Sequence, residues 1–230
     1  MAKALDHRVR VAALRREEMQ LHLLFYGLAL ASTNSIYELE VEDVIKQAEV
    51  SRGSFYNYFP SLPALYDGLA KQLMQEFDGL INVSMPQNFD TTTRLASTMR
   101  ILMRLVVDFP MLGRFLTQIQ WPNQNLDSEI FQNIIRDIHL GIKEGSFTNM
   151  PASIGANIAI GSLIGGIHSM LLKRPAKGFE DQVTNQVLIG LGIDAKVASK
   201  ISQMPLPAKY QLPETGIFGK LVEMGALAKK

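Results

Sequence analysis

The chain has 230 residues, of which 47% are hydrophobic, so it can bury a sizeable core and extensive disorder is excluded. Cysteine is absent, which excludes disulfides, thiolate metal sites and cysteine nucleophiles and fits a cytoplasmic protein. The formal net charge is only +1, so any surface for nucleic acid must be a local feature. A secretory signal is not expected, because Arg15, Arg16, Glu17 and Glu18 interrupt the apolar pattern near the first residues.

Residues 1–16 form a basic segment, for which two interpretations stay open. It is either a solvated terminus or an arm that touches DNA beside a main recognition helix. From about residue 17 to 33 the pattern is helical, with one broad apolar face. This helix is expected to pack under the next two helices and to close a three-helix head. The residues of its apolar face are Leu21, Leu24, Phe25, Leu28 and Ala31.

Residues 41–66 organise the rest of the chain. Val44, Ile45 and Ala48 keep helical spacing, which then breaks at residues 49–50, and Ser51 is a good N-cap for a second helix. That second helix must end near Pro60. Two short helices joined by a few residues predict a helix-turn-helix.

The second helix has a composition suited to DNA. Its first turn is small and polar with one cation, so its backbone can enter the major groove. Phe55 and Phe59 are expected to anchor it to the core, while Arg52 can reach guanine or phosphate and Asn57 can read adenine. The candidate DNA-binding residues are Lys46, Ser51, Arg52, Gly53, Ser54, Tyr56, Asn57 and Tyr58.

This stretch resembles the helix-turn-helix of TetR-type transcriptional regulators, through the spacing Ser51-x-Gly53-x-x-Tyr56-x-x-Phe59. The resemblance implies an all-α fold, a homodimer, a palindromic double-stranded DNA operator and a small effector. Three features depart from the family pattern. Glu49 stands where the turn usually has Gly, Leu62 where Lys often meets a phosphate, and residues 39–41 lack the usual Thr.

The remaining pattern is helical throughout, and no strand-like alternation is found. A long helix over about 62–83 is expected to link the head to the body, and the break at 85–88 follows it. The predicted domains are a DNA-binding head over residues 1–60 and a ligand-binding and dimerisation body over 61–230, with 61–84 as the link. Further helices are expected at about 91–108, 111–120, 127–143, 152–172, 179–191, 194–204 and 217–228.

Residues 152–172 carry no formal charge and are long enough to cross a membrane. Their polar and small residues favour a buried helix instead, either in a core or at a subunit interface. Together with 179–191 this helix is expected to form half of a four-helix dimer interface, and no membrane partner is expected. The small residues that lie on one stripe are Gly155, Ala159, Ser162, Gly166 and Ser169.

Catalytic and metal-binding motifs are not apparent. The four histidines lack paired metal-ligand spacing, and no phosphate-binding glycine loop is present, so no enzyme, metal or cofactor is expected. Apolar and histidine residues of the body are either plain core or the walls of a pocket for a small apolar or amphipathic effector. These candidates are Met99, Met103, Phe115, Trp121, Phe131, Ile135, His139 and His168.

The leading interpretation is therefore a homodimeric, repressor-like regulator that an effector releases from DNA or alters. A protein-interaction module of the same fold, with weak or lost DNA binding, remains the alternative. The acids of the head, Glu38, Glu40, Glu42, Asp43 and Glu49, support that alternative.

Overall fold

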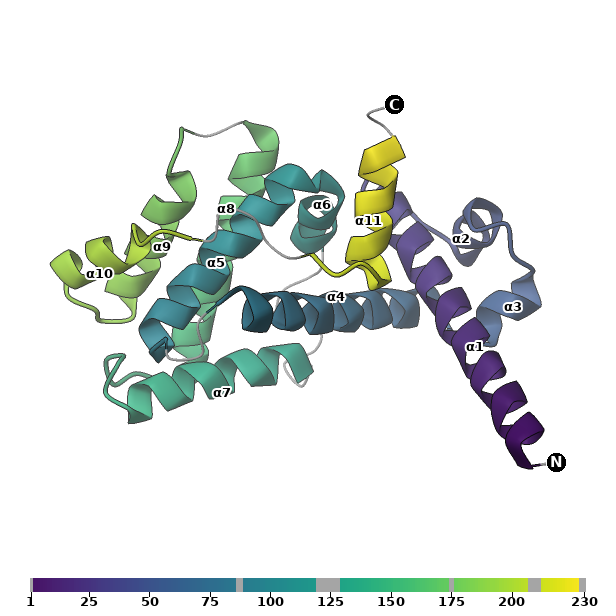
Figure 1. Cartoon of the computed structure of the whole chain (residues 1–230). Coiled ribbons are helices and arrows are strands. Elements are labelled where there is room, and N and C mark those ends of the chain that lie inside the picture. Colours follow the sequence, from purple (N-terminus) through teal and green to yellow (C-terminus); the bar gives the residue numbers. More distant parts are fainter. Residues whose placement is uncertain (1, 86–88, 119–128, 174–175, 207–211, 228–230) are drawn as a thin grey trace. The chain divides into compact units, whose positions relative to one another are not determined.

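The computed structural model describes residues 2–85, 89–118, 129–173, 176–206 and 212–227, without the side chains of 2–9, 129–131, 133 and 226–227. Within these residues the chain is all-helical and has no strand, as the sequence predicts (Figure 1). The helices are α1 (Ala2–Ala31), α2 (Val41–Gln47), α3 (Arg52–Tyr56), α4 (Leu62–Ser84), α5 (Thr91–Asp108), α6 (Pro110–Gln118), α7 (Glu129–Lys143), α8 (Ala152–Leu172), α9 (Phe179–Gly190), α10 (Ala195–Ser202) and α11 (Gly216–Leu227).

The chain divides into two compact units. The first contains residues 1–77 together with 212–230, and the second contains residues 78–211. Helix α4 therefore contributes to both units, and α11 belongs to the same unit as the helix-turn-helix.

Helix α1 begins much earlier than the pattern of apolar residues suggests. It runs from Ala2 to Ala31, so residues 2–16 of the basic segment are the first half of this helix and not a separate arm before it. The physical reason is composition, because Ala, Leu, Arg and Lys favour a helix and the segment has neither Gly nor Pro. Among the side chains of α1 that the structure describes, from residue 10 on, the buried ones lie in its second half and include Leu23, Leu24, Leu28 and Ala31.

The second unit is built around α8, which packs against α5, α6, α7 and α9. Small residues allow this close packing: a Cβ added at Gly155 would lie 2.7 Å from Ile138, and one at Gly166 would lie 3.2 Å from the Sδ of Met103. Gly155, Ala159 and Gly166 of the predicted stripe thus face the core of their own chain. Ser162 is half-buried and Ser169 is exposed. Helix α8 is apolar and long enough to span a membrane, yet it is a packed helix here.

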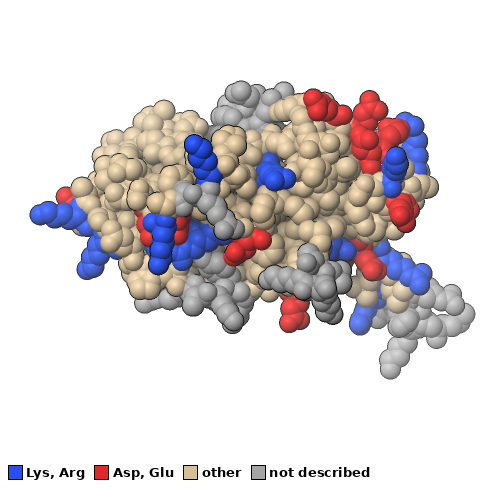
Figure 2. Space-filling model, turned by 90° about the horizontal axis from the view of Figure 1, so that it is seen from above, with Lys and Arg blue, Asp and Glu red and all other residues tan. Residues whose placement is uncertain are grey.

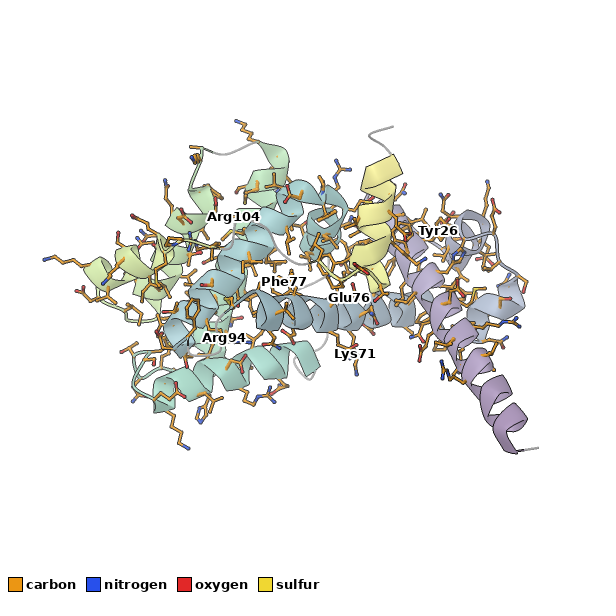
Figure 3. All side chains as sticks on the ribbon, in the orientation of Figure 1. Tyr26, Lys71, Glu76, Phe77, Arg94 and Arg104 are labelled. Carbon is orange, nitrogen blue, oxygen red and sulfur yellow. The ribbon has the colours of Figure 1, made fainter. Side chains whose placement is uncertain are left out.

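An ion-pair network fastens α9 to α5. The buried guanidinium of Arg100 donates from Nε to Asp181 (2.6 Å) and from Nη1 to the carbonyl oxygen of Met204 (2.7 Å). Arg104, labelled in Figure 3, donates from its Nε to Glu180 at 2.9 Å. A buried cation needs such partners, since an uncompensated charge would be costly. The network therefore helps to hold α9 beside α5.

Candidate nucleic-acid interface

The helix-turn-helix is built by caps at the start of each short helix. At the start of α2 the backbone N–H of Glu40 donates to the carboxylate of Asp43 (2.9 Å). At the start of α3 the hydroxyl of Ser51 accepts the backbone N–H of Ser54 (3.0 Å), which confirms Ser51 as the N-cap. Helix α3 is shorter than expected and ends at Tyr56, in place of continuing to Pro60.

The turn between the two helices has an unusual residue. Glu49 has a φ of 54°, in the left-handed region that favours Gly. The sequence comparison with the family pattern anticipates this, because Gly is the usual residue there. Glu49 is exposed, so its side chain meets water while its backbone is held in an unfavourable conformation.

The aromatic residues of this segment divide between core and surface. Phe55 is fully buried and Phe59 is 5% exposed, so both anchor the segment as predicted. Among the candidate DNA-binding residues, Ser54 and Tyr58 are half-buried. The other candidates are exposed, namely Lys46, Ser51, Arg52, Gly53, Tyr56 and Asn57.

Arg52 is held by two neighbours. Its Nη1 lies 2.7 Å from the Oε1 of Glu42, and its guanidinium carbon lies 5.8 Å from the centre of the Tyr56 ring. Both members of the ion pair are more than half exposed, so the pair is weak and DNA phosphate can compete for the guanidinium. Figure 2 shows red acidic and blue basic side chains side by side over this part of the surface.

An open groove of about 970 Å³ lies beside the end of α3. Helix α1 contributes Val11, Ala12, Arg15 and Arg16 from its first half and Met19 from just past its middle, and the other wall is formed by Asn57 and Tyr58. The α1 residues recur at intervals of three and four, which places them on one side of a helix. The sequence assigns both arginines to the basic segment, and their helical spacing is the signal that they share one face of a helix. Their position beside Asn57 and Tyr58 comes from the fold.

Two further residues of the head have defined surroundings. The imidazole of His22 on α1 is hydrogen-bonded through Nε2 to the carbonyl oxygen of Ala48, at 2.8 Å. Tyr66 on α4 is buried, and its burial together with the negative charge of Asp43 raises the pKa of its hydroxyl from 10.0 to about 12. The sequence pattern does not indicate a role in the site for either residue.

The candidate effector residues are not all brought together. Met99, Met103 and Phe115 are buried on α5 and α6, and Ile135 is half-buried on α7. His139 and His168 are exposed, on α7 and α8. Trp121 and the side chain of Phe131 lie outside the described residues. No cluster of three or more potential metal-binding side chains occurs in the described part of the chain.

Helix α8 also has an exposed face, about a third of a turn around the helix from the buried small residues. Ile154 is 50% exposed and Leu172 is 71% exposed, at the two ends of this face. Between them a Cβ added at Gly161 or Gly165 would meet no atom within 4 Å. Ile189 on α9 is exposed as well. A surface with large apolar residues at its ends and glycines at its centre is suited to a second helix at close range.

The helical fold, the capped helix-turn-helix and the polar surface of its second helix define a helix-turn-helix regulator that binds DNA. The family described as "Tetracyclin repressor-like, C-terminal domain" matches residues 90–204, and the chain belongs to this tetracycline-repressor-like family of transcriptional regulators. The match covers most of the second unit. The match does not include the helix-turn-helix, whose assignment rests on its own residues and geometry.

Curated relatives and solved structures agree with this assignment. The nucleoid occlusion factor SlmA of Shewanella halifaxensis is 23% identical over 177 residues, which are 71% of this chain and 90% of SlmA. The crystal structure of RolR with its ligand resorcinol has a TM-score of 0.65 at 23% identity, covering 85% of this chain and 98% of RolR. FadR of Bacillus subtilis, in complex with stearoyl-CoA, has a TM-score of 0.54 at 17% identity, covering 75% of this chain and 98% of FadR. At these identities the solved structures show a shared fold.

Proposed function

We propose that this chain is a repressor that acts in the cytoplasm, binds a palindromic DNA operator as a homodimer and is released or altered by a small, mainly apolar effector. One observation carries the DNA-binding part of the proposal. Arg15 and Arg16 of α1 line the same groove as Asn57 and Tyr58, next to the exposed side of α3. Cations and base-reading side chains thus lie on adjoining surfaces of one unit.

The two parts of this surface have different tasks. Arg52, Ser54 and Asn57 approach base edges or phosphates in the major groove, and Tyr56 touches the backbone. Arg15 and Arg16 neutralise phosphates beside them, which adds affinity that does not depend on sequence. This source of positive charge offsets the exposed acids of α2 and the turn. It also replaces the Lys that the family pattern often has where Leu62 stands.

The exposed face of α8 and the adjoining residues of α9 support a homodimer. Ile154, Gly161, Gly165 and Leu172 follow one another along this face at helical spacing. A second copy related by a two-fold axis would cover the face and place two heads on successive half-sites, about 34 Å apart on DNA. Of the two stripes of small residues on α8, the exposed one therefore forms the proposed interface.

The proposed effector site lies in the core of the second unit. Met99, Met103 and Phe115 give this core an adaptable, apolar composition. The ligands named for RolR and FadR, resorcinol and stearoyl-CoA, support an organic effector of this kind. An effector can act only through different affinities for the two arrangements of the heads.

The exposed acids of the head favour one alternative. Glu38, Glu40, Glu42, Asp43 and Glu49 are all exposed, so the head could bind a basic protein surface in place of DNA. In that protein-interaction module, DNA binding would be weak or lost. The same assay separates this alternative from the proposal.

The test is selection of bound sites from random DNA by the full chain, followed by affinity measurements at graded salt. We expect a palindromic site and a steep dependence of log affinity on log salt concentration. In the Arg15→Ala and Arg16→Ala double variant the slope should shrink by about two units, since each lost phosphate contact removes nearly one. Failure to enrich any sequence would favour the interaction module.

A further inference from the structure

The last helix of the chain is part of the DNA-binding unit. Helix α11 packs against α1, and the two lie side by side in Figure 1. Its apolar residues Ile217, Phe218 and Leu221 are each at most 2% exposed. A helix that buries three large side chains in this way is an integral part of the head and not a loosely attached tail.

A single carboxylate fixes the start of α11. The oxygens of Glu76, on α4, accept the backbone N–H groups of Ile217 and Phe218, each at 2.8 Å, and Figure 3 shows Glu76 at the foot of this helix. The first N–H groups of a helix have no partner within it, and its N-terminal end carries a partial positive charge. Glu76 satisfies both needs, and the Nε2 of Gln72 holds the same carboxylate at 2.7 Å.

Gly216 makes this contact possible. Its φ is +76°, and a Cβ at this position would lie only 2.6 Å from the carboxyl carbon of Glu76. Any other residue would be strained and would also displace the carboxylate. Gly225, in the same helix, is a matched contrast, because a Cβ there would meet no atom within 4 Å.

Helix α1 connects this contact with the groove. Its second half adjoins α11, where the Nζ of Lys220 lies 5.9 Å from the centre of the Phe25 ring. Its first half carries Arg15 and Arg16. About ten residues separate Phe25 from Arg15, which is about 15 Å along one helix. Since an uninterrupted helix is stiff over this distance, whatever fixes its second half also sets the direction of its first half.

We propose that α11, held by Glu76, is a positioning element for DNA binding. It braces α1 so that Arg15 and Arg16 stay beside the recognition segment, where DNA phosphates meet them. This inference rests on the proposed DNA-binding function. Glu76 and α11 do not touch DNA themselves, and their effect is on the number of phosphate contacts that the head makes.

The test compares Gly216→Ala with Gly225→Ala in the full chain. Hydrogen exchange of the α11 amides reports release of the helix, and the salt dependence of affinity reports phosphate contacts. In Gly216→Ala we expect fast exchange in α11, a salt slope smaller by about two units and an unchanged base preference. In the Gly225→Ala variant α11 should stay at least as protected as in the parent chain, since Ala favours a helix more than Gly does, and the salt slope and base preference should be unchanged.

Glu76→Gln is a milder second variant, since it removes the charge and one of the two acceptor oxygens. It should give the same changes to a smaller extent. Fast exchange of α11 with an unchanged salt slope would overturn the inference, as would an α11 that stays protected in both variants. The Arg15→Ala and Arg16→Ala double variant distinguishes failure of the bracing by α11 from failure of the proposed DNA contacts. An unchanged salt slope in that variant would show that Arg15 and Arg16 do not contact phosphates.

Discussion

The Nε2 atom of His22 lies 2.8 Å from the carbonyl oxygen of Ala48, and this hydrogen bond joins α1 to the last residue before the turn of the helix-turn-helix. A carbonyl oxygen only accepts, so the proton must be on Nε2. The ring of Tyr26 packs edge-on against the imidazole, with 4.8 Å between ring centres. His22 thus has a fixed ring position and a fixed tautomer, and it sets the distance between α1 and the turn.

Replacing His22 with Phe should test this contact, because it keeps an aromatic ring and removes the donor. The carbonyl of Ala48, a residue that is only 3% exposed, would lose its partner. We expect a loss of about 1–2 kcal/mol in the free energy of unfolding, measured in urea. His139→Phe is the control, since His139 is exposed, and it should leave stability nearly unchanged.

Glu49→Gly should stabilise the chain. The φ of 54° at Glu49 costs an L-residue roughly 1–2 kcal/mol, whereas Gly adopts it without strain. Part of that gain is offset by the greater entropy of Gly in the unfolded chain, which leaves about 0.5–1 kcal/mol. Thermal unfolding measures this gain. Glu49→Gln serves as the control, because it removes the charge and keeps the strain, and equal stabilisation by both variants would contradict the explanation.

The two faces of α8 can be separated with one pair of substitutions. Gly166 is packed against Met103 and Val183 of its own chain, so Gly166→Leu should overpack that core and cost about 1–3 kcal/mol. Gly161 has an open surface, so Gly161→Leu should keep the helical content and shift sedimentation toward the monomer. A dimeric Gly161→Leu variant would place the interface elsewhere on the molecule.

Local patterns explain which features could be predicted. The cap at Ser51, the buried Phe55 and the extent of α8 follow from residues close together in the sequence. Which stripe of small residues on α8 is buried cannot be predicted in this way. Both faces of α8 have small residues, and only the helices packed around α8 decide which face is covered. The contact between Glu76 and α11 joins residues 141 and 142 positions apart, and no local pattern encodes such a pairing. The open groove depends likewise on the packing of the head, which brings α1 beside Asn57 and Tyr58.

Tyr66 should make stability fall at high pH. Its pKa is about 12 in the folded chain against 10.0 for the ordinary group, so folding favours the neutral hydroxyl. The resulting stability is fully present below pH 10 and is lost as the pH rises toward 12, with a total of about 2–3 kcal/mol. Tyr66→Phe should remove this part of the pH dependence, measured by denaturant unfolding across that range. Asp43→Asn should lower the pKa of Tyr66, since the charge of Asp43 contributes to its rise.

The last prediction concerns Arg52 and Glu42, which lie on the surface that we expect to contact bases. If Arg52 pairs with guanine, Arg52→Ala should lower operator affinity by about 1–3 kcal/mol and relax preference at one base pair. Glu42→Gln should instead raise affinity on every sequence by less than about 1 kcal/mol, because it removes the ion pair that holds Arg52 and a charge that repels phosphate. Binding to operator variants with single base changes measures both effects. Unchanged affinity and base preference in Arg52→Ala would show that Arg52 does not contact DNA. The ion pair with Glu42 would then not affect DNA binding.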